Sequence, residues 1–551
     1  MVSNHKIRDI FLGLMLIITG FLSYQITNFF NDDSGVLGYG STTFNTEWIT
    51  SFIITFVIFA VINSIIFFIV AKRFSGNRGK NSSSLLNWRQ VKSEQYKLGT
   101  EFLVTKKERE FKDPVNLPLS QNIKLKQKFF FQHALIISAT GTGKSASILM
   151  PQLQALDGNL SIVVTDPKAE LFRKTAKQLQ AKGFKPLLLK LDRPSVSIKY
   201  NLLLNCRNVN DVRKLAESIL GDDEWGRLSV TLLSAFLFRQ FFKGGTISDV
   251  VRDLAEAPQD AYELELEYFR EDEADKYSLM AFKQFLKTSG SGNTVSSIFT
   301  TIQSKMKVFE YENIEEISQG SNFKIDSLRK EKIALFISYP EEESKVYEPF
   351  LSSFYYQMFN ILKGDESVDE SLGDADGLPV YFLLDEFANI GKIPTMDNLI
   401  STIRSKKMGV EIFLQNIEQL RSVYGPDVAK TILSNCSTKL TMYGNSEESS
   451  KFFSDLSGKR EVETVSVSSS GKGSLSYSTS MQEKQVISVD ELRRLKEHEI
   501  VIISSNIRPI LDDKNYYYMN KIDFWVHKNI KTNRKTKEKI ARFLNKVLKQ
   551  K

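Results

Sequence analysis

Residues 138–145 read SATGTGKS, and this stretch decides the fold. An apolar run at residues 134–137 precedes it, and good helix formers at residues 146–154 follow it. A strand, a loop of small residues and a helix, in that order, form the context in which a Gly-Lys-Ser sequence binds phosphate. The segment therefore predicts a P-loop between a buried strand and a helix.

The P-loop motif predicts a role for each of its residues. Backbone N–H groups converge on the phosphates of a nucleotide, and the helix dipole adds to the attraction. Lys144 is expected to reach the β- and γ-phosphates, and Ser145 to ligate Mg²⁺. Ser138 stands where the motif begins with glycine, and serine is tolerable there if its φ is negative. The predicted nucleotide-binding residues are Thr140, Gly141, Thr142, Gly143, Lys144, Ser145 and Ala146.

A second apolar run, VYFLLDEF at residues 380–387, ends in two acids. It is typical of a buried parallel strand whose carboxylates emerge at the carboxyl edge of a sheet, where ligand sites form in α/β folds. Asp385 is expected to hold Mg²⁺, directly or through water. Glu386 is expected to act as the general base that polarises the attacking water. The adjacent acids at residues 222–223 follow no such strand and are interpreted as surface charge.

A third run, VEIFLQN at residues 410–416, places Gln415 at a strand end. Its amide is predicted to touch the γ-phosphate or the attacking water, and the alternative is a strand-end glutamine without a catalytic role. Four further apolar runs, with helical stretches between them, indicate a large parallel sheet in a doubly wound α/β fold. They lie at residues 161–166, 333–339, 439–444 and 499–505.

Lys144 and Asp385 are farther apart in the chain than one or two βα units require. Most of the excess lies at residues 209–323, which have helical patterning and predict a mainly helical inserted domain. The acidic stretch at residues 253–275 is either a solvated face or a surface for a basic protein. Residues 464–482 are rich in serine and glycine and are interpreted as a mobile loop.

Two apolar segments, residues 10–30 and 48–71, are uncharged and long enough to span a bilayer as helices. Lysines and arginines lie just before the first segment and just after the second, whereas the charged residues of the connecting loop are all acids. The positive-inside rule then places both termini in the cytoplasm. A signal peptide and a buried core helix are the alternatives for the first and second segments. Residues 74–100 are polar and are interpreted as a linker.

The net charge of +8 is a property of the C-terminal tail. Residues 528–551 contain ten lysines and arginines and one acid, a net charge of +9, so the rest of the chain carries about −1. Helical spacing of apolar residues from Ile540 to Leu548 predicts a basic amphipathic helix. This helix could dock on the body, bind an anionic partner such as DNA, or lie on an anionic membrane surface. Cys206 and Cys436 show neither a disulfide framework nor metal-ligand spacing.

Several motifs in one order resemble the VirD4/TraG family of coupling proteins. They are LLDEFANIGKIP (383–394), STIRSKKMGVEIFLQN (401–416), QLRSVYG (419–425), TILSNCSTKL (431–440), VVTDPKAEL (163–171), KYNLLL (199–204) and the P-loop. The chain departs from the family pattern at Ser138, and at Ala169, where the family usually has glycine. The resemblance covers roughly residues 1–510.

The resemblance implies a membrane-anchored, RecA-like ATPase with an inserted all-α domain, assembled as a hexameric ring. Its ligands would be ATP and Mg²⁺, and its substrate single-stranded DNA bound to a relaxase. The α domain would recognise the relaxase or relaxosome, and the ring would feed the channel proteins of a type IV secretion system. Arg404 matches the arginine finger that completes a neighbour's site. It could equally be an ordinary surface arginine.

Two other motors share this core. A double-stranded DNA translocase of the FtsK type is expected to have more membrane spans and a C-terminal DNA-reading domain. An export motor for proteins alone is not excluded by the sequence. The predicted organisation is a membrane hairpin (1–73), a linker and the start of the body (74–132), two nucleotide-binding segments (133–208 and 324–525), the helical domain (209–323) and the tail (526–551).

Overall fold

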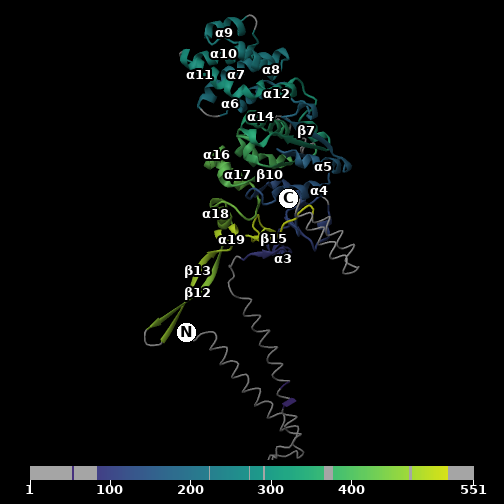
Figure 1. Ribbon diagram of the computed structural model, residues 1–551, viewed down its shortest axis with the longest axis vertical. Coiled ribbons are helices and arrows are strands. Elements are labelled where there is room, and N and C mark those ends of the chain that lie inside the picture. The colour runs from purple at the N-terminus through teal and green to yellow at the C-terminus, as the bar shows by residue number, and fades with distance from the viewer. Residues whose placement is uncertain are drawn as a thin grey trace, which may run out of the picture. The chain divides into compact units, whose positions relative to one another are not determined.

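We describe the protein from a computed structural model. It describes residues 84–518, apart from 114, 222–223, 272–273, 290–291, 365–376 and 471–473, together with 53, 54 and 57. The basic tail and nearly all of both apolar N-terminal segments lie outside these residues. None of the helices that the structure describes is long and apolar enough to span a membrane. The described residues from 84 to 518 belong to one compact unit (Figure 1).

A central sheet organises this unit. In the described part of the chain it has ten strands in the order β1-β15-β14-β11-β5-β10-β9-β6-β8-β7. The strands are Leu86–Asn87 (β1), Ala134–Ile137 (β5), Ser161–Thr165 (β6), Lys185–Lys190 (β7), Ile333–Ser338 (β8), Val380–Leu384 (β9), Met408–Leu414 (β10), Thr438–Thr441 (β11), Glu499–Ser504 (β14) and Ile510–Asp513 (β15). All neighbours from β11 to β7 are parallel, as the sequence predicts for an α/β fold.

The prediction that residues 499–505 extend the parallel part of the sheet is wrong. β14 runs antiparallel to β11, and β15 runs antiparallel to β14, so the sheet is mixed. The direction is invisible in the sequence because a strand covered on both faces is continuously apolar in either orientation. Here β14 and β15 are joined by a short turn, whereas parallel neighbours need a long crossover.

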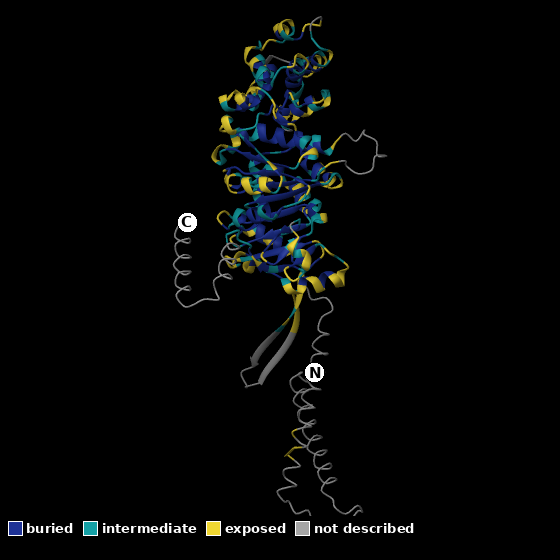
Figure 2. Ribbon diagram, turned by 90° about the vertical axis from the view of Figure 1, so that its right-hand side faces the viewer, coloured by how far each residue is buried: buried dark blue, intermediate teal, exposed yellow. Residues whose placement is uncertain are grey.

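Both faces of the sheet are buried, and alternate residues of each strand enter two different cores. In β9, Phe382 and Leu384 contact one core, while Tyr381 and Leu383 contact the other. Because side chains alternate across a strand, a strand buried on both sides is apolar throughout. Figure 2 shows the strands as the most deeply buried part of the unit.

Helices of the parallel crossovers cover these faces. The first face carries α14 (Ser344–Lys363), α16 (Ile417–Tyr424) and α17 (Pro426–Asn435), and the second carries α4 (Met150–Ala155) and α5 (Glu170–Ala181). Shorter helices lie in the connections: α13 (Ser327–Lys330), α15 (Met396–Thr402), α18 (Glu447–Leu456) and α19 (Val489–Arg493). The single-turn helices are η1 (Arg109–Lys112), η2 (Gln127–Gln132), η3 (Ser145–Leu149), η4 (Pro194–Val196), η6 (Glu341–Glu343), η7 (Phe387–Ile390) and η8 (Ile403–Lys406).

The described residues between β7 and β8 form helices that gather at one end of the unit (Figure 1). They are α6 (Val209–Leu220), α7 (Glu224–Lys243), α8 (Ile247–Glu256), α9 (Ala261–Tyr268), α10 (Lys276–Ser289), α11 (Gly292–Met306), η5 (Lys307–Glu310) and α12 (Glu312–Ser318). Phe269 and Phe282 stack inside this segment with ring centroids 4.5 Å apart. These rings belong to the same continuous core as strands of the sheet, so the helices are packed against it. The domain limits themselves remain a prediction.

Part of the segment interpreted as a linker is ordered structure. Residues 88–98 form α3 (Trp88–Leu98), whose start is fixed by a capping box between Asn87 and Gln90. That capping pair was the available signal for a helix. A small sheet follows, formed by β2 (Leu103–Thr105), β4 (Ile123–Leu125) and β3 (Leu117–Pro118).

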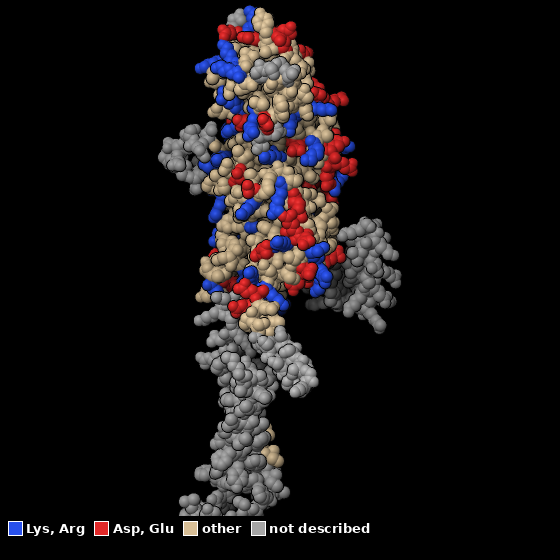
Figure 3. All heavy atoms as spheres, turned by 90° about the vertical axis from the view of Figure 1, so that its left-hand side faces the viewer, with Lys and Arg blue, Asp and Glu red and all other residues tan. Residues whose placement is uncertain are grey.

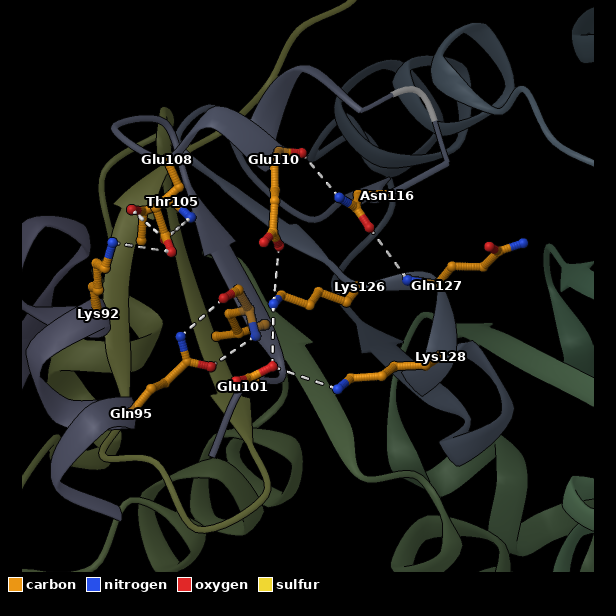
Figure 4. Close-up of polar contacts among 11 residues, drawn as sticks. Lys92, Gln95, Glu101, Thr105, Glu108, Glu110, Asn116, Lys126, Gln127 and Lys128 are labelled. Carbon is orange, nitrogen blue, oxygen red and sulfur yellow. Dashed lines mark hydrogen bonds and ion pairs between the residues drawn. The ribbon is translucent and has the colours of Figure 1, made fainter. Parts of the chain in front are cut away.

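Polar side chains connect the small sheet to its surroundings (Figure 4). The Gln95 side chain donates to the Leu103 carbonyl and accepts from the Leu103 N–H, at 2.9 and 2.8 Å. The Lys126 ammonium lies 2.9 Å from Glu110 and 3.5 Å from Glu101. These contacts hold β2 beside α3 and the start of η2.

The interpretation of residues 464–482 as a loop is wrong. β12 (Lys459–Ser470) and β13 (Ser474–Gln485) pair antiparallel along their whole length. Serine and threonine are common in loops, but their alternation with valine over residues 464–468 is a strand pattern. The hairpin extends away from the sheet (Figure 1).

Charges of both signs are intermixed on the face shown in Figure 3. This distribution agrees with a body whose net charge is near zero once the basic tail is set aside.

Candidate nucleotide-binding site

Three loops meet at the carboxyl edge of adjacent parallel strands. The P-loop follows β5, the pair Asp385-Glu386 follows β9, and Gln415 follows β10. β10 lies between the other two strands, with Leu414 paired to Ile137 and Ile412 paired to Leu384. The sequence predicted all three strand ends, but it could not order the strands.

The P-loop backbone has the shape that glycines permit. Gly141 and Gly143 have φ values of +79° and +88°, in the left-handed region that side chains disfavour. Ser138 is outside that region, so the condition for a serine at the first position is met. Its hydroxyl lies 2.5 Å from the Thr142 hydroxyl, and its N–H donates to the Leu414 carbonyl. The Ser138 hydroxyl therefore adds one contact that a glycine would lack, whereas the backbone N–H, which a glycine also has, joins the loop to β10.

The helix after the P-loop begins with a π-turn. Residues Ser145–Leu149 form η3, which continues directly into α4. Ser147 donates to the Gly143 carbonyl through both its N–H and its hydroxyl, each at 2.8 Å. Turns of this kind occur inside helices at functional sites. Here the widened turn places Ser145 and Ala146 at the helix N-terminus.

Lys144 is almost fully buried at the centre of the site. Its ammonium donates to the Ser138 carbonyl at 2.7 Å and the Leu414 carbonyl at 3.3 Å. It lies 3.8 Å from Glu386 Oε1. Burial lowers the pKa of Lys144, and the charges of Glu386 and Asp385 oppose that change.

The two acids after β9 have different environments. Burial and, less strongly, the charge of Glu386 raise the pKa of Asp385 to about 7, although Lys144 acts in the opposite direction. Glu386 has φ +49° and ψ +50°, a left-handed conformation that is strained for a residue with a side chain. Such strain persists where surrounding contacts impose it, and it turns the Glu386 side chain toward the P-loop lysine.

Gln415 contacts the glutamate. Its amide Nε2 donates to Glu386 Oε2 at 3.0 Å, and its N–H donates to Gln419 Oε1 at 3.2 Å. Gln415, Glu386 and Lys144 thus form one chain of contacts. The predicted contact of Gln415 with phosphate or water is a proposal about the bound state.

The structure does not bring Arg404 into this cluster. Arg404 lies in η8, before β10, and its side chain is exposed. η8 is at the amino edge of the sheet, and Gln415 is at the carboxyl edge. An arginine at that edge is outside the reach of its own P-loop.

Sequence reasoning missed four residues at or beside the site. Lys514 donates to the Thr142 carbonyl at 2.8 Å. Lys168 and Glu341 form an ion pair of 2.9 Å, and the pKa of Lys168 is raised by Glu341 and, less strongly, by Glu386 and Asp385. The buried Tyr339 hydroxyl has no hydrogen-bond partner among the described residues, and burial raises its pKa. Lys168 lies within the quoted motif at residues 163–171, which was the available signal for it. No local pattern marks the other three, because each reaches the site through tertiary contacts.

The residues present fit a nucleotide and a magnesium ion. The left-handed glycines and the helix N-terminus form a phosphate cradle. Asp385 is a buried carboxyl beside a second acid, and a cation would favour its charged form. The Tyr339 hydroxyl, which is buried and has no partner in the described part of the chain, is a polar atom that a hydrated ligand would satisfy. Ser145 and Asp385 supply the oxygen ligands that magnesium prefers.

The fold and this cluster define a P-loop nucleotide-binding protein of the α/β class. The model of the family described as type IV secretory system conjugative DNA transfer matches residues 92–550. The chain therefore belongs to that family.

Curated relatives agree with this assignment. The chain is 22% identical over 410 residues to the protein VirD4 of Rhizobium radiobacter, covering 71% of this chain and 57% of the relative. It is 24% identical over 405 residues to the conjugal transfer protein TraG of Escherichia coli, covering 66% and 62%. The chain thus spans less than two thirds of the length of these relatives.

Solved structures of one protein share the fold. The plasmid coupling protein TrwB in complex with the non-hydrolysable ATP analogue ADPNP matches with a TM-score of 0.59 and 16% identity, covering 80% of this chain and 95% of that one. Its complex with ADP and Mg²⁺ matches with a TM-score of 0.57 and 16% identity, covering 79% and 93%. At these identities the likeness shows the fold alone.

Proposed function

We propose that the protein is the ATP-driven coupling protein of a conjugative type IV secretion system. It moves relaxase-bound single-stranded DNA toward the transfer channel. The observation that carries the proposal is the chain of contacts from Gln415 through Glu386 to Lys144 beside the P-loop, in a member of this family. A scaffold that only binds nucleotide has no need of a carboxylate held in this position.

Each residue of the cluster has a role in hydrolysis. Lys144 binds the β- and γ-phosphates and compensates their charge. Glu386 accepts a proton from the attacking water as general base. Gln415 holds Glu386 through the Nε2–Oε2 hydrogen bond and orients the carboxylate. Ser145 and Asp385 would hold magnesium, which would neutralise charge at the phosphates when bound.

The complexes of TrwB with ADPNP and with ADP and Mg²⁺ support ATP and Mg²⁺ as the ligands. They belong to a protein of the same fold, and the P-loop here has the residues to hold the same groups.

We further propose that residues 10–30 and 48–71 anchor the chain in the cell membrane, with both termini and the ATPase body in the cytoplasm. Within the second segment, Ile53, Ile54 and Val57 are helical and exposed, which suits side chains that face lipid. Anchoring the motor beside a channel directs each hydrolysis cycle outward across the membrane.

The position of Arg404 supports a ring. An exposed arginine at the edge opposite its own P-loop is available to a neighbouring copy, as in ring ATPases that place sites between subunits. We propose a homohexamer in which Arg404 completes the next subunit's site. The relaxase or relaxosome binds the helical segment at residues 209–323, whose acidic stretch suits a basic nucleoprotein.

An export motor that moves proteins without DNA, or an FtsK-like translocase on double-stranded DNA, would use the same nucleotide site. Neither is favoured by a specific contact in the described residues.

ATP turnover by the purified full-length chain tests the proposal. We expect turnover to rise with single-stranded DNA and to fall by about 10²–10⁴-fold in Glu386→Gln, the range for loss of a general base. Glu447→Gln is the matched control, because Glu447 is exposed at the start of α18. Turnover indifferent to DNA would favour the protein-export alternative, and stimulation by double-stranded DNA alone would favour the translocase. An assembled chain without turnover would overturn the catalytic assignment.

A further inference from the structure

Residues 514–517 follow β15 and lie directly on the P-loop. We name this segment the C-terminal strap. The Lys514 ammonium donates to the Thr142 carbonyl at 2.8 Å, and the Tyr517 N–H donates to the Ala146 carbonyl at 3.1 Å. A Cβ at Gly143 would lie 3.3 Å from the Tyr516 ring. The strap therefore contacts the middle of the phosphate cradle, at Thr142 and beside Gly143, and its far end at Ala146.

Lys514 occupies an unfavourable environment for a lysine. The residue is 4% exposed, and burial, opposed by the charge of Glu497, lowers the pKa of Lys514 to about 8. Its ammonium lies 4.5 Å from the centre of the Tyr443 ring. Within the described residues, no carboxylate forms an ion pair with it. A buried ammonium is costly unless it is paired, whereas a methionine would fill the same space without that cost.

The contact with Thr142 controls the direction of the next amide. In a planar trans peptide the carbonyl of one residue and the N–H of the next point in opposite directions. Lys514 holds the Thr142 carbonyl toward the strap, so the Gly143 N–H points to the opposite side of the loop. That side is where a P-loop amide donates to phosphate. Gly143, with φ +88°, has the conformational freedom to rotate away if it is not held.

We propose that Lys514 is a positioning residue of the nucleotide site, which holds the Thr142–Gly143 peptide in the orientation that binds phosphate. The Tyr517–Ala146 hydrogen bond fixes the far end of the cradle in the same way. The strap, although distant from the P-loop in the sequence, thus preorganises the P-loop for phosphate binding. This inference rests on the proposed function, since it assigns Lys514 to the binding of ATP.

The test compares Lys514→Met and Lys514→Arg with the wild type in the full-length chain. Binding of a fluorescent non-hydrolysable ATP analogue measures Kd, and ATP turnover measures KM and kcat. We expect Lys514→Met to raise Kd and KM about tenfold with little change in kcat, because an orienting hydrogen bond to the cradle serves substrate and transition state alike. Lys514→Arg retains a donor and is expected to stay within about threefold of the wild type.

Lys496→Met is the matched control. Lys496 lies near the strap in sequence, is 71% exposed, and pairs with Glu499 rather than with the P-loop. The Kd of the Lys496→Met variant for the analogue is expected to equal that of the wild type. A Lys514→Met chain that binds the analogue as tightly as the wild type would overturn the role of Lys514 and leave the proposed function intact. A loss of melting temperature without a change in Kd would overturn it too. A wild-type chain that binds no analogue would overturn the proposed function, and this inference with it.

Discussion

The two edges of the central sheet hold different residues of the proposed ATPase site. At the carboxyl edge, Lys144, Glu386 and Gln415 contact one another. At the amino edge, Arg404 is exposed beside the buried His133, whose Nδ1 accepts a hydrogen bond from the Val410 N–H. Burial and, to a smaller extent, the charge of Arg404 lower the pKa of His133 to about 4. The histidine is therefore a neutral structural support.

The length of β10 separates these edges. Its seven residues span roughly 20 Å at the usual rise of a strand. One chain therefore brings the P-loop, Lys144 and Glu386 together but keeps the candidate arginine finger, Arg404, at the opposite edge. This difference between the edges is the reason that the proposed function includes a second copy of the chain.

The largest effect is expected at the amino edge. Arg404→Ala should lower kcat by about 10³-fold or more, the range for an arginine finger, with little change in the Kd for ATP. Mixing Arg404→Ala with Glu386→Gln chains should restore part of the turnover, because some interfaces then combine an intact Glu386 with an intact Arg404. ATP turnover of the separate and mixed chains measures this. Unchanged turnover in Arg404→Ala would contradict the proposed role of Arg404 as an arginine finger.

Between the two edges, β10 contains a buried acid, Glu411, whose effect on the pH dependence of stability can be measured. Glu411 accepts hydrogen bonds from Gln152 Nε2 and the Tyr381 hydroxyl, and burial raises its pKa from 4.5 to about 7. The folded state therefore binds the proton more tightly than the unfolded state does. Stability falls as the pH rises from about 4.5 to 7, and the full penalty, about 3 kcal/mol, is present above pH 7.

Glu411→Gln should remove this penalty. The melting temperature of the variant should exceed that of the wild type at pH 8 and approach it near pH 5, as measured by thermal unfolding at a series of pH values. The Gln152 Oε1 atom, which has no partner among the described residues, can accept from the new amide. A variant less stable than the wild type at pH 8 would show that the carboxylate is stabilised by its two donors.

At the carboxyl edge, Gln415→Ala tests whether the hydrogen bond to Glu386 matters for turnover. The loss of a hydrogen bond to a charged group should lower kcat by about tenfold, with KM nearly unchanged. Gln284→Ala, on the exposed side of α10, is the matched control. Equal turnover in the two variants would show that Gln415 is a strand-end glutamine without a role in turnover.

The smallest effect is expected at Ala169, also at the carboxyl edge. It has φ +51° at the start of α5, where the family usually has glycine. Ala169→Gly should relieve about 1–2 kcal/mol of left-handed strain and lose about 0.5–1 kcal/mol to the entropy of the unfolded chain, a small net gain. Ala176→Gly inside the same helix should destabilise by about 1 kcal/mol. Denaturant unfolding of both variants measures the changes in the free energy of unfolding, which should have opposite signs. Destabilisation of both variants would contradict the strain at Ala169.

Local patterns predicted the parts of the site that lie within one strand and the loop after it. The P-loop, Asp385-Glu386 and Gln415 were found because an apolar run followed by small or polar residues marks a buried strand and its carboxyl end. Local patterns failed where composition was ambiguous. The hairpin of β12 and β13 was interpreted as a loop from its serines, and the direction of β14 left no trace in its apolar run.

The P-loop, the acidic strand end and the largely parallel α/β sheet can be predicted from the sequence, because each is encoded in residues that are neighbours along the chain. Only the tertiary structure decided that β10 lies between the P-loop strand and the acidic strand, that Gln415 holds Glu386, and that Arg404 faces away. It alone placed Lys514 on the P-loop, a contact between residues 372 positions apart. Such contacts depend on strand order and chain path, which are set by packing over the whole fold.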